Sequence, residues 1–248
     1  MGLVFNMEKY KISIITVVFN AVNTIEQTIN SVINQQYGNV EYIIIDAGSN
    51  DGTLDIIKKY EDKIDYWVSE PDYGLYHAMN KGIEKATGDI IGMINADDYY
   101  FENVFSDVAK AFEGKDLEKN IFFGDMEHDG VVVKGWRQNS VKIGAFATHP
   151  SMFCPKKVYD TIGKYRLWYK ILADYDFMYR AYHVYSIQPI YLAKKVAFFR
   201  VGGLASNNIF RSFTEELIIK IENGEKIKNA FSVYLLKLLR FYMKSLWK

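Results

Sequence analysis

Several features are scarce in this sequence of 248 residues, and each scarcity excludes a class of protein. The single cysteine, Cys154, rules out an intrachain disulfide framework and a cysteine-based zinc site, and its apolar neighbours predict a plain buried thiol. Acidic and basic residues number 30 each, so the net charge gives no support to nucleic-acid binding. No stretch reaches the ~18 consecutive apolar residues of a membrane-spanning helix.

Linkers and targeting signals are also missing from the pattern. Only four prolines occur, no Gly/Ser-rich or charge-rich segment interrupts the chain, and hydrophobic residues make up 49% of it. One compact domain with a C-terminal appendage is therefore expected. Residues 1–11 lack the apolar run of a signal peptide, and together with the low cysteine content this predicts a reducing, cytoplasmic location.

The first hundred residues alternate between short apolar strands and amphipathic helices. Strands are predicted at 12–19, 40–45, 64–69 and from Ile90 onward, with helices between them that include one capped by Thr53 and one at 75–86. This order predicts an α/β fold with a doubly wound, mostly parallel sheet and helices on both faces. Right-handed crossovers would then gather the carboxyl ends of the strands at one edge.

Polar side chains follow each of these predicted strands. Any one of them is an ordinary turn residue, but together they are expected to line one crevice: Asn20, Asp46, Ser49, Asp51, Asp72 and Asp97. The turn after the first strand has no Gly-x-Gly-x-x-Gly, and a P-loop is absent, so phosphate must be held in another way. We therefore expect a divalent cation at Asp97, beside Asp98. Such a site favours a nucleotide-diphosphate ligand whose phosphates are bridged by the metal.

The second half of the chain changes to a mixed pattern. Helices are predicted at 103–112, 155–163, from Ile171 and at 211–222, and strands at 120–124, 131–136, 145–153 and 196–201, with a hairpin turn at 125–130. His149 lies beside a proline and is open to a structural or a functional interpretation. Asp174 begins a helix, where it is either a plain N-terminal acid or a general base at the rim of the crevice.

The C-terminal segment 226–248 has a composition of its own. It contains six basic residues and no acid, interleaved with aliphatic and aromatic side chains. Such a basic amphipathic helix is typical of segments that bind a membrane surface. The alternative is a helix that packs on its own domain or on a second subunit.

With these motifs in hand, the chain resembles the GT-A fold glycosyltransferases of family 2, most closely the branch that builds bacterial polysaccharides. The resemblance covers roughly residues 11–205 and is carried by segments in the right order, namely 14–20, 45–53, 69–76, 78–83, 95–98, 149–153 and 173–177. It implies an inverting, metal-dependent hexosyltransferase that takes a nucleotide-diphosphate sugar, with UDP favoured, and uses Mn²⁺ or Mg²⁺.

The resemblance also implies roles for individual residues. Asp174 matches the catalytic base, and Asp97, with Asp98 adjacent, the metal-binding end of the Asp-x-Asp motif. The implied substrate-binding residues are Thr16, Val17, Asn20, Asp46, Ser49, Asp51, Asp72, Asn80, Lys81, Asn95, Ala96 and His149. Residues 1–100 would form the nucleotide-sugar half and 101–210 the acceptor half of a domain spanning 1–210, and 211–248 a helical segment that associates with membrane.

Three departures from the family pattern bear on these roles. Asn95 replaces the first acid of Asp-x-Asp, so metal affinity is expected to be lower, and Ala173 replaces the Glu that precedes the base. Ala47 stands where glycine is common and restricts that turn. Asp176 is the alternative base.

The expected partners are a nucleotide-sugar donor, a saccharide or lipid-linked acceptor and, through 226–248, the inner face of the plasma membrane, with no nucleic acid. Two other functions stay open: a non-catalytic nucleotide-sugar-binding protein, and a nucleotidyltransferase. A nucleotidyltransferase would usually need a phosphate loop rich in glycine, arginine and lysine near its N-terminus, and the sequence has none there.

Overall fold

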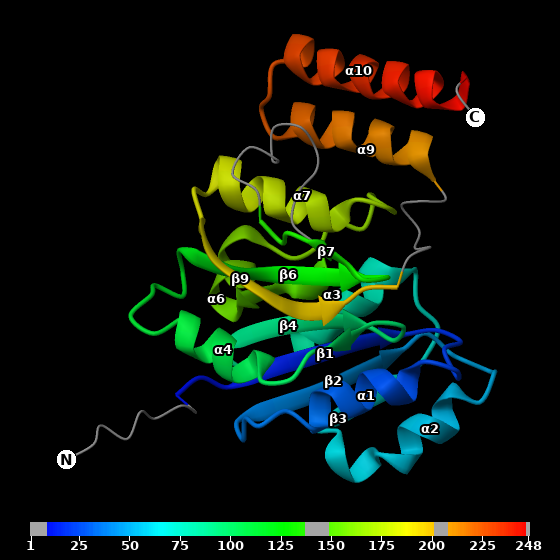
Figure 1. Ribbon diagram of the computed structural model, residues 1–248, viewed down its shortest axis with the longest axis vertical. Helices are drawn as coiled ribbons and strands as arrows, with labels where there is room; N and C mark the ends of the chain where they lie inside the picture. Colours follow the sequence, from blue (N-terminus) through cyan, green and yellow to red (C-terminus); the bar gives the residue numbers. More distant parts are fainter. Residues whose placement is uncertain (1–8, 137–148, 201–207, 247–248) are drawn as a thin grey trace.

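The computed structural model describes residues 9–136, 149–200 and 208–246 (Figure 1). A mixed sheet runs through the molecule in the order β3-β2-β1-β4-β8-β6-β9-β5, and β7 pairs with β6. Its strands are β1 (Ile12–Val18), β2 (Val40–Asp46), β3 (Tyr66–Ser69), β4 (Ile90–Asn95), β5 (Tyr99–Tyr100), β6 (Asn120–His128), β7 (Val131–Val133), β8 (Met152–Pro155) and β9 (Gln188–Phe198).

Helices cover both faces of this sheet, as the alternating pattern predicted. They are α1 (Ile25–Ile33), α2 (Thr53–Lys59), α3 (Leu75–Lys85), α4 (Val104–Ala111), α6 (Lys156–Ile162), α7 (Ala173–Tyr179), α9 (Ile209–Glu222) and α10 (Ile227–Leu246). Short helical turns, η1 (Glu61–Lys63), η2 (His149–Ser151) and the π-helical η3 (Arg180–Val184), complete the described elements. Within the described residues, none of the helices is both long and apolar enough to cross a bilayer.

The N-terminal half is the parallel sheet that the sequence predicted. β1 is buried at all seven positions and pairs in parallel with β2 on one side and β4 on the other. Helix α3 lies close against it, because a Cβ at Gly82 would stand only 2.3 Å from Ile15 Cγ2. The α2 cap was predicted wrongly: Gly52, in the left-handed conformation with φ 102°, is the N-cap, and Thr53 is the first helical residue.

The C-terminal half of the sheet is mixed, and several predicted boundaries there were wrong: the strand predicted at 131–136 ends at Val133, and the one predicted at 145–153 starts only at Met152 in the described residues. β6 continues through Asp125 to His128, so the hairpin turn consists of Asp129 and Gly130, both at positive φ, rather than of 125–130. β9 begins at Gln188, well before the predicted start at 196; the early part was missed because residues 188–195 are exposed or half-buried and lack a clean apolar alternation. Residue 201 of that predicted strand, and 145–148 of another, lie outside the described residues.

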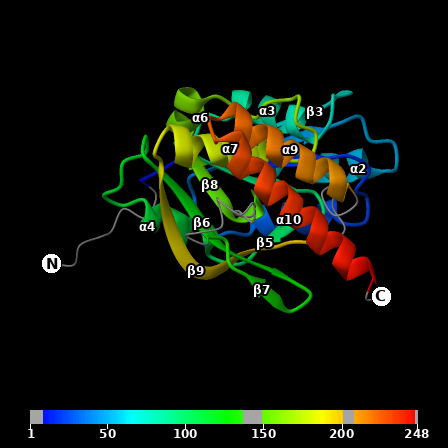
Figure 2. The ribbon, with the colours of Figure 1, turned by 90° about the horizontal axis from the view of Figure 1, so that it is seen from above.

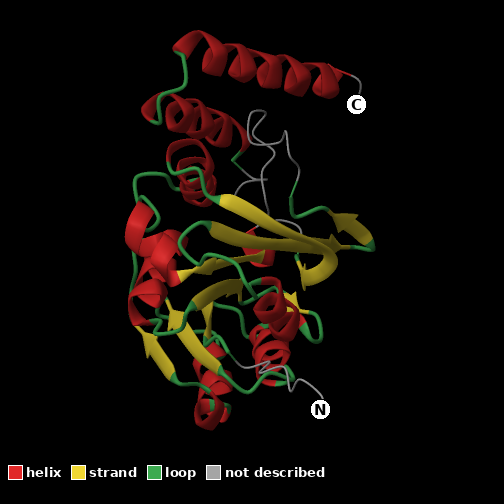
Figure 3. Ribbon diagram, turned by 90° about the vertical axis from the view of Figure 1, so that its left-hand side faces the viewer, coloured by secondary structure: helices red, strands yellow, loops and turns green. Residues whose placement is uncertain are grey.

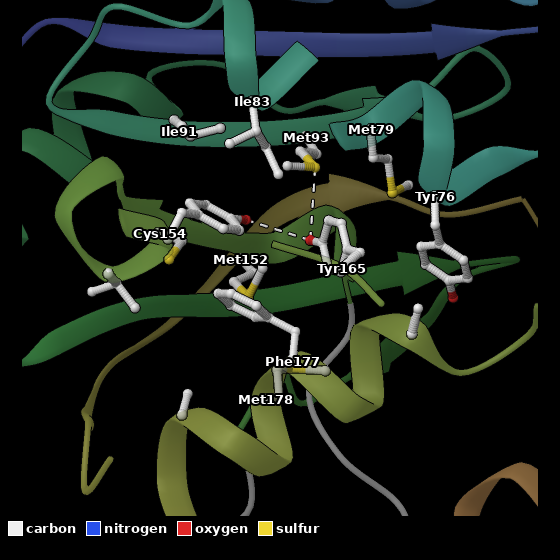
Figure 4. Packing of buried hydrophobic residues seen from close by; sticks show 14 of the residues in the cluster. Tyr76, Met79, Ile83, Ile91, Met93, Met152, Cys154, Tyr165, Phe177 and Met178 are labelled. Carbon is white, nitrogen blue, oxygen red and sulfur yellow. Dashed lines mark hydrogen bonds between the residues drawn. The ribbon is translucent and has the colours of Figure 1, made fainter. Parts of the chain in front are cut away.

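Two buried clusters lie on opposite sides of the sheet. One packs α1, α2 and α4 against it, and the other packs α3, α6 and α7. Figure 4 shows part of the second cluster, where Met79 and Ile83 of α3 and Phe177 of α7 surround Tyr165. Cys154 is fully buried here, and burial raises the pKa of its thiol, as expected for an inert core cysteine.

Helices α7, α9 and α10 form successive layers above the sheet (Figures 1 and 3). α9 contacts α7 on one side and α10 on the other, and α10 is the outermost layer. Seen from above, α10 crosses over α9 (Figure 2). The helix predicted at 211–222 thus begins slightly earlier, at Ile209, and the basic C-terminal segment is helical as expected.

Candidate active site

A cleft of about 710 Å³ opens at the carboxyl ends of β1 and β4, beside the start of α3. The parallel register of these strands sets Val17 opposite Asn95, and both lie at the rim. The lining residues are Val17, Val18, Phe19, Asn20, Ala21, Thr24, Ala47, Pro71, Asp72, Gly74, Leu75, Ala78, Asn95, Ala96 and Asp97. Six residues predicted to bind substrate or metal are therefore brought together: Val17, Asn20, Asp72, Asn95, Ala96 and Asp97.

The loops after β1 and β2 are tied together behind the cleft. Asn20, at φ 48°, donates its backbone N–H to Ser49 Oγ at 2.7 Å and accepts the Asn50 N–H on its Oδ1 at 3.0 Å. Asp51 accepts the N–H groups of Val22 and Thr53. Ser49 and Asp51, both predicted to bind substrate, thus hold the wall of the cleft in shape but do not line it.

Asp46 and Thr16 lie behind the cleft rather than in it. Asp46 is fully buried, and its carboxylate accepts hydrogen bonds from the N–H groups of Gly48 and Ser49 and from the hydroxyls of Ser49 and Ser69. Thr16 is also fully buried, with its hydroxyl 3.0 Å from that of Tyr42. Neither offers an exposed side-chain oxygen for the contact with a nucleotide that the sequence predicted.

Asp97 and Asn95 both line the cleft and carry side-chain oxygen atoms. Asp97 is exposed, whereas Asn95 is half-buried and its Oδ1 is a buried acceptor with no hydrogen-bond partner among the described residues. Buried carbonyl oxygens are nearly always paired, so this atom points to a group that binds there. The described residues contain no cluster of three or more His, Cys, Asp or Glu side chains suited to a metal. Mg²⁺ or Mn²⁺ fits nevertheless, because such ions often take one or two protein ligands and complete their shell with phosphate and water.

Asp98, the second predicted metal ligand, does not line the cleft. It is 1% exposed, and its carboxylate accepts the Arg200 N–H at 2.8 Å and the Asn95 amide at 3.3 Å. Burial, helped by the neighbouring Asp97, raises the pKa of Asp98 to about 7. Its role in the structure is to hold the turn that presents Asp97. Arg200, which also bonds the Asp97 carbonyl, was not singled out from the sequence.

Asn80 and Lys81 lie on the second turn of α3, outside the cleft. The Asn80 amide bonds the backbone of Tyr165 in both directions, at 2.8 and 3.1 Å, and Lys81 pairs with Glu70 at 2.8 Å. Asp72 lies at the cleft, where its carboxylate accepts the Gly74 N–H at 2.7 Å and so shapes the turn that starts α3. The polar residues of this motif thus fasten α3 to its neighbours.

Asp174 is the second residue of α7 and faces the same helix α3. Its Oδ1 accepts the Tyr76 hydroxyl at 2.9 Å and the Tyr175 N–H at 2.8 Å. Figure 4 shows Tyr76 at the edge of the buried cluster that packs α3, α6 and α7 on the sheet, with its hydroxyl directed away from α3. Burial raises the pKa of Asp174, and the Tyr76 hydrogen bond opposes that rise. Tyr76 belongs to the segment 69–76 of the family resemblance, but no role was predicted for it.

Asp176, the alternative base, is held in a buried ion pair. Its side chain is fully buried and lies 3.0 Å from Arg180 Nε and 3.2 Å from Arg166 Nη1. A carboxylate held in this way has no path to an acceptor hydroxyl. His149 is also buried, which lowers its pKa to about 4, so it is neutral at physiological pH; its Nε2 has no hydrogen-bond partner within the described residues.

The sheet order, the cleft at the strand ends and the acid presented by the turn after β4 define a nucleotide-binding α/β enzyme fold. The profile of Glycosyl transferase family 2 matches residues 13–188, and the chain belongs to this family. A PGL/p-HBAD biosynthesis glycosyltransferase of Mycobacterium bovis is 28% identical over 229 residues, 87% of each chain. A glycosyltransferase of Mycobacterium tuberculosis is 31% identical over 204 residues, 79% of this chain and 77% of that one.

Solved structures share the fold. Residues 1–349 of Staphylococcus aureus TarS in complex with UDP superpose with a TM-score of 0.70 at 19% identity, covering 94% of this chain and 72% of that one. The chain spans only 43% of the longer TarS structure. The mannosyltransferase PcManGT of Pyrobaculum calidifontis, in complex with GDP-Man and Mn²⁺, gives a TM-score of 0.65 at 16% identity, covering 93% and 74%. The fold is therefore that of the GT-A glycosyltransferases, and the protein is a family 2 glycosyltransferase.

Proposed function

We propose that this glycosyltransferase inverts the anomeric centre of a hexose, which it moves from a nucleotide-diphosphate sugar to a saccharide or lipid-linked acceptor in cell-surface polysaccharide synthesis. The observation that carries the proposal is that helix α3 contacts both the cleft and the proposed catalytic base. α3 starts with Leu75 at the cleft that contains Asp97, and its next residue, Tyr76, contacts Asp174. UDP is the favoured nucleotide, since TarS structures contain UDP and UDP-GlcNAc.

The Asp97 carboxylate and the Oδ1 of Asn95, which has no hydrogen-bond partner in the part of the chain that the structure describes, would hold a divalent cation on the diphosphate. When bound, Mn²⁺ or Mg²⁺ neutralises the negative charge that develops on the leaving diphosphate. Asn95 supplies a neutral oxygen where the family pattern has a carboxylate, so the pair carries one negative charge less. Weaker metal binding than in an Asp-x-Asp enzyme is the expected consequence.

Asp174 takes the proton from the acceptor hydroxyl as that oxygen attacks the anomeric carbon. A single displacement from the face opposite the diphosphate inverts the configuration, and no second carboxylate nucleophile is required. The raised pKa of Asp174, caused mainly by burial, makes its carboxylate a stronger base. Tyr76 holds the carboxylate in place through Oδ1.

A donor screen tests the proposal. The purified chain is incubated with UDP-, GDP- and TDP-sugars, with Mn²⁺ or with EDTA, and release of the nucleoside diphosphate is measured. Mn²⁺-dependent release of the nucleoside diphosphate from one class of donor supports the proposed glycosyl transfer. Binding of a donor by calorimetry, with no release in the presence of acceptor saccharides or lipid-linked saccharides, would instead indicate a non-catalytic nucleotide-sugar-binding protein.

We further propose that α10 rests on the anionic inner surface of the plasma membrane. Its outward side is apolar, with Phe231, Leu235, Leu236, Leu239, Tyr242 and Met243 each 44–61% exposed. Lys228, on the first turn of α10, and Arg240 are exposed as well, and residues 226–248 contain no acid. Apolar side chains with flanking cations complement an anionic lipid surface, where a lipid-linked acceptor would be found.

Flotation with liposomes tests this second proposal. The protein should float with phosphatidylglycerol vesicles and much less with phosphatidylcholine vesicles, and L236S/L239S should abolish flotation. V131S/V132S is the matched control, because Val131 and Val132 are 54% and 52% exposed on β7, away from α10. A stable dimer by light scattering that L236S/L239S dissociates, without flotation of the wild type, would assign the face to a second copy of the chain.

A further inference from the structure

Helix α9 buries an acidic side chain against the segment that carries the proposed base. Glu215 is only 6% exposed. Its carboxylate accepts three consecutive backbone N–H groups, from Lys170 to Oε1 at 3.0 Å, and from Ile171 and Leu172 to Oε2 at 2.9 and 3.0 Å. Arg211, one turn earlier on α9, donates its Nε to Oε1 at 3.0 Å.

These three N–H groups belong to the residues that lead into α7. The first N–H groups of a helix and of the turn before it have no partners within the helix, and a carboxylate there is favoured by both hydrogen bonding and the helix dipole. α7 has no side-chain cap of its own at Leu172. Glu215 therefore supplies, from a neighbouring helix, hydrogen-bond acceptors for the backbone that leads into α7. Figure 3 shows α9 lying directly against α7.

We propose that Glu215 is a positioning residue for the transfer reaction, which fixes the chain at 170–172 so that Asp174, two residues further on, faces the acceptor. The proposal rests on the assignment of Asp174 as the base. Charge-assisted hydrogen bonds to an anion are stronger than those between neutral groups, so three of them restrain the segment tightly. A catalytic group displaced by about 1 Å can lose on the order of 100-fold in rate.

Glu215 also acts on Asp174 through its charge. Among the described residues, the titratable groups that act on Asp174 include Tyr76 from α3, Tyr165 from the segment before α7, and Glu215 from α9. Burial is the main cause of the raised pKa of Asp174, and the negative charge of Glu215 adds to it. Glu215 therefore has two separable effects, one through its hydrogen bonds and one through its charge.

Three variants separate these effects. Glu215→Gln removes the charge and places an N–H₂ group against donors, so kcat should fall about tenfold or more and the acid limb of the pH profile should move to lower pH. Glu215→Asp keeps the charge but is too short for the three bonds, so kcat should fall while the acid limb stays in place. Glu222→Gln is the control: it removes one charge from the same helix, keeps an acceptor for the Tyr169 hydroxyl, and should leave both quantities unchanged.

The KM for the donor and the thermal unfolding midpoint are measured for each variant. The proposal requires kcat to fall with an unchanged donor KM in protein that is still folded at the assay temperature. It is overturned if Glu215→Gln keeps the wild-type kcat and acid limb, or if kcat falls only in proportion to the folded fraction. Failure of the assignment of Asp174 looks different, since Asp174→Asn would then stay active whatever Glu215 does.

Discussion

The hydroxyl of Tyr76 and the carboxylate of Asp174 lie 2.9 Å apart, although the two residues are separated by 98 positions in the sequence. The same hydroxyl lies 2.7 Å from the Ile171 carbonyl, so its single proton is shared between the two acceptors. Tyr76 thereby joins the helix that starts at the donor cleft to the helix that carries the proposed base.

Tyr76→Phe should move the acid limb of the kcat profile to higher pH. The Tyr76 hydrogen bond favours the ionised carboxylate, so without it burial raises the pKa of Asp174 further. A higher pH is then needed to ionise the base. The measurement is kcat against pH at saturating donor. Tyr179→Phe is the control, because Tyr179 is also on α7 but its hydroxyl donates to Glu225 and not to Asp174. A limb that stays in place or moves to lower pH would contradict the contact.

Asp176→Asn should reduce stability far more than catalysis. The substitution leaves the buried Arg180 guanidinium without its anion, and breaking one side of a buried pair costs about 3–5 kcal/mol. Urea unfolding gives the free energy of unfolding, and kcat is expressed per folded molecule. Loss of turnover in protein of wild-type stability would make Asp176 the base after all.

Asp97→Asn should remove the effect of metal on donor binding. We expect Mn²⁺ to tighten binding of the nucleotide sugar to the wild type by about tenfold or more, since an ion shared with the diphosphate links the two. Calorimetric titrations with Mn²⁺ and with EDTA compare the wild type and the variant. Asp72→Asn makes the same charge change in the same cleft and should keep the dependence on Mn²⁺. Equal affinity of the wild type with and without Mn²⁺ would exclude the metal role.

The parallel half of the fold was predictable because its signals are local. The strands at 12–18 and 40–46 are buried on both faces and read as apolar runs, and the polar residues at their ends mark the turns. β9 was predicted too short because residues 188–195, which end in two lysines, are exposed or half-buried, and their strand form depends on pairing with β6. Thr53 was taken for a cap because its residue type suits that position, whereas the left-handed Gly52 takes it.

The candidate site was predictable to the extent that strand ends converge. Val17, Asn20, Asn95 and Asp97 follow from the parallel register, and the structure brings them to one cleft. Which of the neighbouring acids are exposed is a matter of tertiary packing, and the sequence does not distinguish Asp97 from the buried Asp46 or Asp98. Glu215 had no local signal at all, because its partners are backbone groups more than 40 residues earlier.

The most direct test of the account compares turnover and donor binding in Asp174→Asn. The variant removes the proposed base, keeps the size of the side chain, and retains an oxygen that can accept the Tyr76 hydrogen bond. With the donor identified by the screen, product formation should fall by a factor of about 1,000, while donor affinity in the presence of Mn²⁺ stays within about twofold of the wild type. Near-normal turnover by Asp174→Asn would contradict the central claim.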